Sequence, residues 1–451
     1  MVPSPDRPHA ALRSNALYPL LAINFIGVLG FSIVLPFLVF LVTGFGGNAF
    51  VYGLVGAMYP TFQLFGAPVL GRWSDLYGRR KIILLSHFGT LVSWGFFLLA
   101  LVIPVTTLFS VDSRILGSFA ITLPLAVLFF ARALDGLTGG NVSVANAYLA
   151  DITGEEERSK NYGRMSISSN LGFILGPTLA GILGSTIYGE IIPVLAAILI
   201  SLAAMVVIIS WLPESRRCSL QRGRDRGQIH RVFGMEQTDC TATRIMRQTG
   251  FREILGLRFI PFMLVLYFFI FLSFNIFYSS FSVHAVQGLA WTVTQLGVFF
   301  SFLSICMVFV QGPVLSRASK RYTESLLVMV GSVMLGINFL LLLSPDTRII
   351  YLAALFFALG NGLMWPSFIS LLSKTAGTEN QGAVQGFAGS AGSLASIIGL
   401  IAGGVLYSMF GAASFLIAAA VIFGVSILSS RLRTLQERMK GSGTAGTPVG
   451  A

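Results

Sequence analysis

Two charged side chains, Arg132 and Asp135, lie inside a long apolar segment at residues 121–149. Asp135 is 14 residues from either end of this segment, so a helix crossing a bilayer would hold it near the midplane. Residues three positions apart share a helix face and can interact. Charges at this depth are costly, face the protein interior and usually mark an ion or substrate path. We therefore predict that Asp135, with Arg132, serves proton coupling; the alternative is a purely structural ion pair.

A second group of residues suited to chemistry is the short polar segment Gly71–Lys81, which holds one acid and four basic residues. The Asp75 carboxylate can accept hydrogen bonds from the amides of a helix N-terminus. The arginines of the segment can pair with acids on neighbouring helices. This segment could therefore connect several helices at one end of a bundle.

Apolar segments long enough to cross a membrane account for most of the chain. Its 451 residues are 55% hydrophobic and only 11% charged, with a mean hydropathy of +0.80. A soluble domain has about 25% charged residues, so the composition excludes a soluble enzyme, and it is too apolar for a disordered chain. We expect an all-α integral membrane protein with twelve transmembrane helices. The predicted spans are residues 17–42, 50–70, 82–104, 121–149, 165–185, 191–212, 259–286, 291–313, 325–344, 349–373, 384–408 and 412–430.

The positions of lysine and arginine predict the orientation of these spans. With the N-terminus in the cytoplasm, 27 of the 30 basic residues fall on the cytoplasmic side, and only Arg114 and Arg348 fall on the opposite side. The positive-inside rule then predicts that both termini are cytoplasmic. This distribution also accounts for the net charge of +12, so we expect no binding of nucleic acid.

The twelve spans divide into two sets of six around a polar stretch at residues 213–258, which we interpret as a cytoplasmic linker. We expect an N-terminal six-helix bundle at 1–212, a C-terminal six-helix bundle at 259–430 and a cytoplasmic tail at 431–451. Repeated halves usually meet around a midplane site and rock about it. The repeat is clearest in three glycine pairs, each separated by 223 residues: Gly163 and Gly386, Gly176 and Gly399, Gly181 and Gly404.

Four motifs resemble those of a known transporter family. The loop Gly71–Lys81 is similar to the signature between helices 2 and 3 of the major facilitator superfamily, and Arg132–Gly136 resembles its helix 4 motif. Gly172–Gly181 resembles the glycine-proline motif in helix 5 of its drug:proton antiporters. Ala147–Thr153 is similar to tetracycline efflux proteins. The resemblance implies two pseudo-symmetric six-helix halves and transport by alternating access.

The resemblance also implies a role for the loop as a latch in the outward-facing state. The latch would involve Asp75 at the N-terminus of helix 11 and an ion pair between Arg79 and Asp151. The corresponding segment of the second half has Ser316 and Ser319 in place of the acid and the second glycine, so its latch is expected to be weak or asymmetric. The full set of predicted latch residues is Gly71, Asp75, Gly78, Arg79, Arg80 and Asp151.

The helix 5 motif is expected to pack closely and to bend the helix, because small residues let helices approach and proline removes a backbone donor. In the family this bend seals the cavity against leak. Helices 1, 4, 7 and 10 line the family's cavity, which makes polar and aromatic residues on them substrate candidates. The motif residues are Gly172, Gly176, Pro177 and Gly181; the cavity candidates are Asn24, Asn141, Tyr267, Phe271, Phe274, Asn275, Tyr278, Asn361 and Trp365.

The sequence contains no nucleotide-binding loop and no cluster of metal ligands, so we expect no cofactor, no metal and no enzymatic activity. His87 and His284 lie near span ends and are expected to be interfacial. The leading hypothesis is a monomeric, proton-coupled exporter of amphiphilic organic small molecules in the cell (inner) membrane. The first span has Asn24 but no acid, so an importer or uniporter of a small metabolite is an alternative. A transport-inactive membrane receptor or scaffold is a third.

Overall fold

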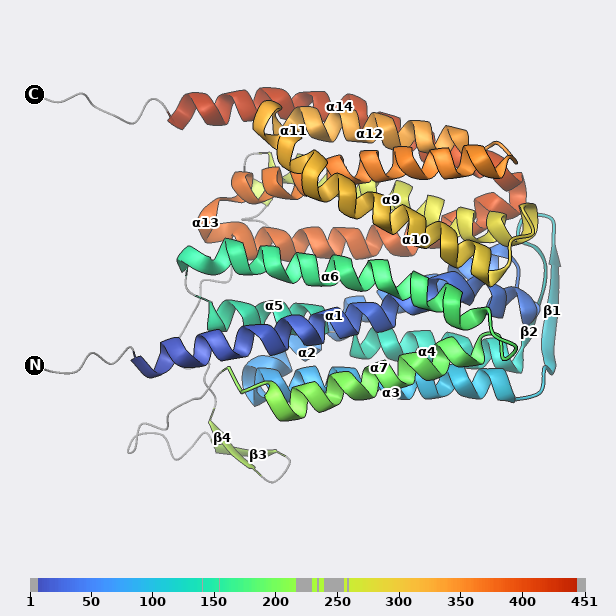
Figure 1. The fold of residues 1–451 in the computed structure, drawn as a ribbon, viewed down its shortest axis with the longest axis horizontal. Coiled ribbons are helices and arrows are strands. Elements are labelled where there is room, and N and C mark those ends of the chain that lie inside the picture. The colour runs from blue at the N-terminus through green and yellow to red at the C-terminus, as the bar shows by residue number, and fades with distance from the viewer. Residues whose placement is uncertain are drawn as a thin grey trace, which may run out of the picture. The chain divides into compact units, whose positions relative to one another are not determined.

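The computed structural model is built almost entirely of helices, which pack against one another within each of two units (Figure 1). Most of the expected linker at 213–258 lies outside the residues that the structure describes. Within that stretch, β3 (Ile229–Val232) pairs with β4 (Met235–Thr238) in an antiparallel arrangement. The described residues are 7–139, 141–153, 155–215, 229–232, 235–238, 255–257 and 259–443.

The chain forms two compact units. Unit 1 comprises residues 1–46, 58–109 and 120–248, and it holds the apolar core formed by Leu20, Ile83 and Tyr148. A two-stranded sheet of β1 (Thr107–Ser113) and β2 (Gly117–Thr122) follows the third helix. The helices of the N-terminal half are α1 (Arg7–Gly44), α2 (Ala49–Tyr77), α3 (Arg79–Val102), α4 (Leu123–Thr138), α5 (Asn141–Ile152), α6 (Glu155–Gly184) and α7 (Ile191–Trp211).

Unit 2 comprises residues 47–57, 110–119 and 249–451, so the first turns of α2 group with it. Its second helix begins with a capping box, in which the Thr292 hydroxyl and the Gln295 side chain each bond the other's backbone amide. The elements of the C-terminal half are α9 (Ile260–Val283), η3 (His284–Gly288), α10 (Val293–Phe309), η4 (Val310–Val314), α11 (Leu315–Arg321), α12 (Glu324–Leu341), α13 (Thr347–Phe410), η5 (Gly411–Ala413) and α14 (Ser414–Gly443).

Every expected span falls on helix except for a few residues at some of the ends, but the spans and helices do not correspond one to one. The expected span 121–149 is divided into α4 and α5, because α4 ends at the Gly-Gly pair that begins at Gly139. The expected spans 349–373 and 384–408 both lie on α13, whose ribbon turns back on itself (Figure 1). Within the described residues, nine helical stretches are long and apolar enough to cross a bilayer.

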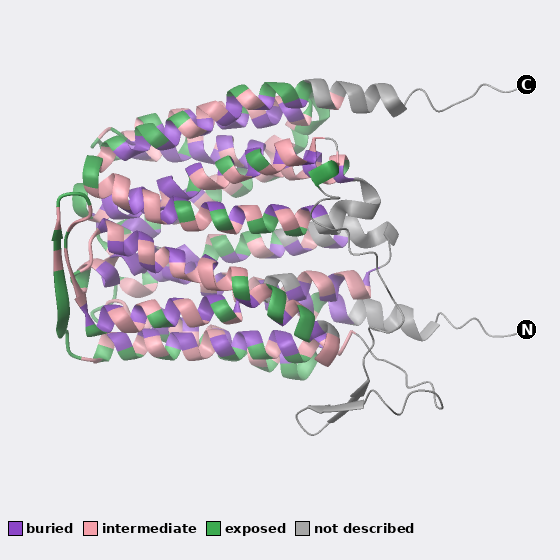
Figure 2. Cartoon of the chain, turned by 180° about the vertical axis from the view of Figure 1, so that it is seen from behind, coloured by how far each residue is buried: buried purple, intermediate pink, exposed green. Residues whose placement is uncertain are grey.

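Large apolar side chains cover much of the outer surface of the helices. Leu199 and Ile427, one in each unit, are 65% and 73% exposed, and Phe130 is 54% exposed. Exposed and buried positions alternate along the helices (Figure 2). Water would not tolerate so many exposed apolar groups, whereas lipid does. The chain is therefore an integral, multi-pass membrane protein.

Close packing of α6 against α1 positions the expected helix 5 motif. Ser32 Oγ of α1 donates to the carbonyl oxygen of Gly172 at 2.9 Å. A Cβ atom at Gly176 would overlap the Ser32 hydroxyl and lie 2.9 Å from the backbone nitrogen of Ile33. Pro177 and Gly181 are buried on the same helix. Small residues thus permit backbone contact between the two helices.

Gly176→Ala is expected to lower the free energy of unfolding by about 1–3 kcal/mol, because the added methyl group meets backbone that cannot move aside cheaply. Unfolding in mixed detergent micelles, followed by tryptophan fluorescence, measures the change. Gly95→Ala in α3 is the matched control, since no described atom lies within 4 Å of its would-be Cβ. Equal effects of the two substitutions would contradict the close-packing interpretation.

Candidate functional site

Asp135 is a buried carboxylate held by residues of two helices. It lies on α4 and is 8% exposed. Thr90 Oγ1 of α3 donates to its Oδ1 at 2.9 Å. The Arg132 Nη1 atom, one turn earlier on α4, lies 3.5 Å from its Oδ2. The carboxylate thus has one neutral donor and one cation, which are the partners that a buried negative charge requires.

Aromatic rings of two other helices surround the Arg132 guanidinium. Its Cζ lies 5.0 Å from the ring centroid of Tyr59 on α2 and 5.8 Å from that of Phe31 on α1. Both distances are within the range of a cation–π interaction. The rings therefore hold the permanently charged guanidinium in place beside Asp135.

The approach of α2 to α4 depends on Gly136, the residue after Asp135. A Cβ atom at Gly136 would overlap the carbonyl oxygen of Tyr59. Gln63 Nε2 of α2 donates to the Tyr59 hydroxyl at 3.0 Å and to the carbonyl oxygen of Gly139 at 2.9 Å. These contacts fix the Tyr59 ring beside the Arg132–Asp135 pair.

A small cavity of about 30 Å³ adjoins Asp135 within unit 1. Tyr59, His87, Thr90 and Trp94 line it together with Asp135. A buried water needs about 10–15 Å³ of such space, so the cavity has room for one or two waters. It is far too small for an organic molecule, and the chemistry that it can support is proton transfer.

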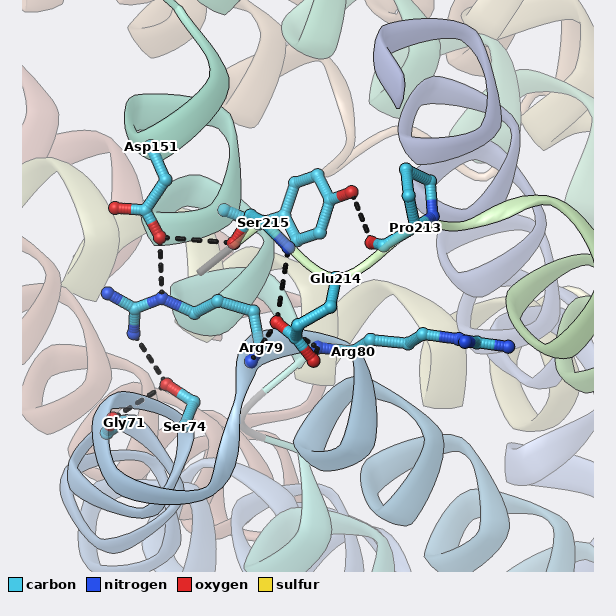
Figure 3. Close-up of polar contacts among 9 residues, drawn as sticks. Gly71, Ser74, Arg79, Arg80, Asp151, Pro213, Glu214 and Ser215 are labelled. Carbon is cyan, nitrogen blue, oxygen red and sulfur yellow. Dashed lines mark hydrogen bonds and ion pairs between the residues drawn. The ribbon is translucent and has the colours of Figure 1, made fainter. Parts of the chain in front are cut away.

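The expected ion pair between Arg79 and Asp151 is present at the end of unit 1 where the basic loop lies (Figure 3). We call this end of the helices the basic end. Arg79 Nε lies 3.0 Å from Asp151 Oδ2, and Arg79 Nη1 donates to Ser74 Oγ at 2.6 Å. The Arg79 side chain is only 5% exposed and that of Asp151 18%. The pair therefore connects α3 to α5 away from bulk water, where it is screened less than a surface pair.

Glu214 belongs to the same cluster, although the sequence interpretation assigned it to the linker. Its carboxylate accepts from the backbone amide of Arg79 at 2.8 Å and from that of Arg80 at 3.2 Å (Figure 3). These amides are the unpaired donors at the N-terminus of α3, where negative charge is favoured. The preceding residue, Gly78, has φ +102, and a Cβ there would lie 2.6 Å from the carboxylate. Only glycine meets both conditions.

Other predicted latch residues have different surroundings. Arg80 Nε donates to the carbonyl oxygen of Ile208 at 3.1 Å, and its Nη2 donates to that of Ile209, so Arg80 caps the C-terminus of α7. Gly71 has open space where a Cβ would lie. The side chain of Asp75 lies outside the described residues. The contact of Asp75 with the N-terminus of the eleventh predicted span (384–408, on α13) therefore stays a prediction.

Unit 2 has a corresponding cluster with the charges reversed. Lys374 Nζ lies 2.6 Å from Oε1 of Glu324, which begins α12. Lys374 follows Asp151 by 223 residues, the offset of the repeated glycines. Gln436 Oε1 accepts from the Ser325 amide at 3.1 Å, as Glu214 does from Arg79 in unit 1. The cluster of unit 2 thus has the opposite polarity to that of unit 1, and Ser316 and Ser319 bond backbone near their own helix.

Two of the four candidate asparagines bond neighbouring helices. Asn24 Nδ2 of α1 donates to Ser169 Oγ of α6 at 2.8 Å, and Asn275 Nδ2 of α9 donates to Ser396 Oγ of α13 at 3.0 Å. Both asparagines are buried. Asn361 is half-buried on α13, and the side chain of Asn141 lies outside the described residues. Asn24 and Asn275 therefore secure helix contacts in this structure.

The aromatic candidates form two groups. Tyr267 and Phe271 of α9 stack with centroids 4.8 Å apart, and Trp365 of α13 lies edge-on at 5.3 Å and 5.2 Å from them. Phe274 and Tyr278 stack separately, with centroids 6.4 Å apart. The first group is a packed aromatic cluster in this structure, in which Tyr267 is buried and Phe271 and Trp365 are half-buried.

Both histidines that were expected to be interfacial are buried within the protein. His87 is 5% exposed and lines the cavity beside Asp135, because α3 begins eight residues earlier and carries it into the bundle. His284 is 8% exposed, and its Nδ1 lies 3.1 Å from the Tyr407 hydroxyl. The spacing of His87, Thr90 and Trp94 could have indicated a shared face of α3. Among the described residues, no group of three or more acids, histidines or cysteines could hold a metal ion.

Comparison with protein families gives one match that covers most of the chain. The model of the Major Facilitator Superfamily matches residues 20–399, and a second match covers residues 263–448. The chain is 24% identical over 389 residues to the tetracycline resistance protein, class C, of Escherichia coli, covering 86% of this chain and 88% of that protein. It is 26% identical over 395 residues to multidrug resistance protein 2 of Bacillus subtilis, with coverage of 86% and 88%.

Solved structures with the same fold include the human organic anion transporter MFSD10, with a TM-score of 0.64 and 19% identity. That similarity covers 92% of this chain and 99% of the transporter. A D-xylose-proton symporter has a TM-score of 0.67 at 13% identity, covering 93% of this chain and 96% of the symporter. At these identities the likeness shows the fold alone.

Glu214→Ala is expected to lower the free energy of unfolding by about 1–2 kcal/mol, because the amides of Arg79 and Arg80 lose their acceptor. The same detergent unfolding measurement applies. Glu190→Ala is the control, since Glu190 precedes α7 without a side-chain cap. A stability equal to that of the control would mean that water replaces Glu214 without loss.

Proposed function

We propose that this chain, which belongs to the major facilitator superfamily, exports amphiphilic organic small molecules in exchange for protons. Members of this superfamily are membrane transporters and not enzymes. Transport would follow alternating access, in which two pseudo-symmetric halves rock about a central site. The basic end would face the cytoplasm, because 27 of the 30 basic residues fall on that side of the predicted topology.

The observation that carries the proposal is the environment of Asp135. A carboxylate in the middle of a span is expensive unless it has a function or a permanent partner. Arg132 lies within ion-pair distance, yet Thr90 and a water-sized cavity adjoin the same carboxylate. A carboxylate whose only role is a structural ion pair does not require access to water. This combination favours a carboxylate that gains and loses a proton.

The exchange of one proton would proceed in two steps. In the outward-open state Asp135 would bind a proton, and the neutral acid would release the attraction on Arg132. In the inward-open state the proton would leave, and the carboxylate would be held again by Arg132 and the Thr90 hydroxyl. The energy of the cycle would come from the proton gradient, and the ion pair would form and weaken with each turnover.

The direction and substrate class rest on relatives and on the aromatic group of unit 2. Two relatives are named for resistance to tetracycline and to multiple drugs, and export is one route to resistance. Tyr267, Phe271 and Trp365 are aromatic and carry no charge, a composition that suits amphiphilic molecules if transport opens this cluster. The alternative function is import or facilitated diffusion of a small metabolite. It would not require a buried acid in unit 2 in addition to Asp135. Among the described membrane helices of unit 2, no buried acid occurs.

The cluster at the basic end would serve as a latch between transport states. Within unit 1 the Arg79–Asp151 pair and Glu214 tie α3 to α5 and to the segment after α7. A rigid end of this kind could present Asp75 to a partner helix in one state and withdraw it in the other. Breaking the Asp75 contact would then alter the rate of rocking rather than the fold.

Asp135→Asn is expected to abolish transport driven by a pH gradient while retaining exchange down a substrate gradient. Asparagine keeps the size of the side chain but cannot carry a proton. The assay uses purified protein in proteoliposomes with an imposed pH gradient and radiolabelled tetracycline, followed by a panel of amphiphilic drugs. Asp112→Asn in the exposed strand β1 is the control. Gradient-driven transport in the Asp135→Asn variant would refute the assignment and favour the uniporter function.

Asp75→Asn is expected to slow transport several-fold and leave the unfolding transition unchanged, because a conformational contact is lost and no core packing is. The same proteoliposomes give the rate, and detergent unfolding gives the stability. Wild-type transport by this variant would leave the loop with a role in topology only.

A further inference from the structure

We propose that His87 relays the proton between Asp135 and the basic end of unit 1, through water bound in the cavity that both residues line. This inference rests on the proposed function, since it specifies how the proton carried by Asp135 leaves and enters. It assigns a role to a histidine outside the transport motifs identified in the sequence.

His87, Thr90 and Trp94 share one face of α3, because they are separated by three and four residues. Thr90 Oγ1 bonds Asp135 directly at 2.9 Å, and His87 lies one turn closer to the basic end. The cavity beside Asp135 is lined by all three of these residues. A helix rises about 1.5 Å per residue, so His87 is about 12 Å along the axis from Arg79, the first residue of α3.

The hydrogen bond at Nδ1 of His87 determines whether Nε2 carries a hydrogen in the neutral ring. Nδ1 lies 3.0 Å from the carbonyl oxygen of Ile83, which can only accept, so Nδ1 carries the hydrogen. In the neutral ring Nε2 then holds a free lone pair. This buried atom has no hydrogen-bond partner among the described residues. The imidazole is therefore fixed in place with a proton acceptor left over.

A second polar atom in the same cavity supports bound water. Trp94 Nε1, a donor, is buried without a partner within the described part of the chain. Leaving a buried donor or acceptor unpaired costs about 1–3 kcal/mol each. One water can accept from Trp94 and donate to His87 Nε2, and the cavity of about 30 Å³ accommodates it. A water at this position would satisfy both atoms and link them to Asp135.

The other walls of the cavity supply no competing base. From α4 the ionisable groups are Asp135 and Arg132, and from α2 the group is Tyr59. The lining residues of α1 are apolar or glycine, and those of α7 are Ser201 and Ala204. His87 is therefore the remaining side chain in this wall with a nitrogen that can accept a proton.

The transfer balances in protons and charge. Protonated Asp135 gives its proton to the bridging water, which passes one of its own to His87 Nε2. The products are the Asp135 carboxylate, held by Thr90 and Arg132, and a His87 imidazolium. The imidazolium then returns the Nε2 proton to cavity water, which would exchange with water at the basic end once the inward-open state admits it. Proton uptake from that side follows the same steps in reverse.

The test measures proton exchange at Asp135 and requires no transport substrate. Full-length protein in proteoliposomes is studied by infrared spectroscopy, and the carbonyl band that disappears in Asp135→Asn identifies the protonated Asp135 side chain. After a switch to heavy water, the shift of this band reports exchange of the carboxyl proton. We expect His87→Gln to slow the exchange at least tenfold. His284→Gln, which alters the buried histidine of unit 2, should leave the rate unchanged.

Each outcome separates the relay from the proposed function. Wild-type exchange in His87→Gln would refute the relay and leave Asp135 as a proton carrier. No Asp135 carbonyl band in the wild type at any pH would refute proton binding at Asp135 itself. If His87→Gln does not fold, nitrogen-15 NMR of histidine in the wild type decides the point. A hydrogen bond at Nε2 that changes in Asp135→Asn supports the relay, and an unchanged Nε2 signal refutes it.

Discussion

A negative charge buried among lipid-facing helices must be compensated by the protein, and this constraint organises unit 1. The Asp135 carboxylate needs a donor and a cation, which Thr90 and Arg132 provide. Arg132 in turn needs an environment that tolerates a cation, and the rings of Tyr59 and Phe31 provide it. Gly136 lets α2 come close enough to deliver the Tyr59 ring. Four helices are thus arranged around a single ionisable group.

The sequence predicted the architecture well, because hydropathy over about 20 residues and the distribution of arginines are strong signals for a membrane protein. It also located Asp135, since an acid in an apolar segment stands out, and it anticipated the Arg79–Asp151 pair through the resemblance. Where the prediction from the sequence was wrong, the reason lies in tertiary packing. The division of 121–149 at Gly139 depends on local geometry and packing that apolar composition does not encode.

Residues that act through long-range contacts were the hardest to predict. Glu214 lies 135 residues from the amide of Arg79 that it accepts from, and only the folded unit brings them together. His87 was misjudged because distance from a span end was used as a measure of depth. Asn24 and Asn275 were suitable cavity residues by type, yet each has a hydrogen-bond partner on a neighbouring helix. A polar residue in a span can line a substrate cavity or bond a neighbouring helix, and the sequence does not distinguish these two roles.

The opposite polarity of the two ion-pair clusters bears on how the chain assembles in the membrane. Unit 1 pairs a cation at the start of α3 with an acid on α5, whereas unit 2 pairs an acid at the start of α12 with a cation on α13. Repeated halves of similar helices risk exchanging partners during insertion. A wrong pairing of α3 with α13 would bring Arg79 against Lys374, and α12 with α5 would bring Glu324 against Asp151. Repulsion between like charges would disfavour these wrong pairings and so favour the packing of each half on itself.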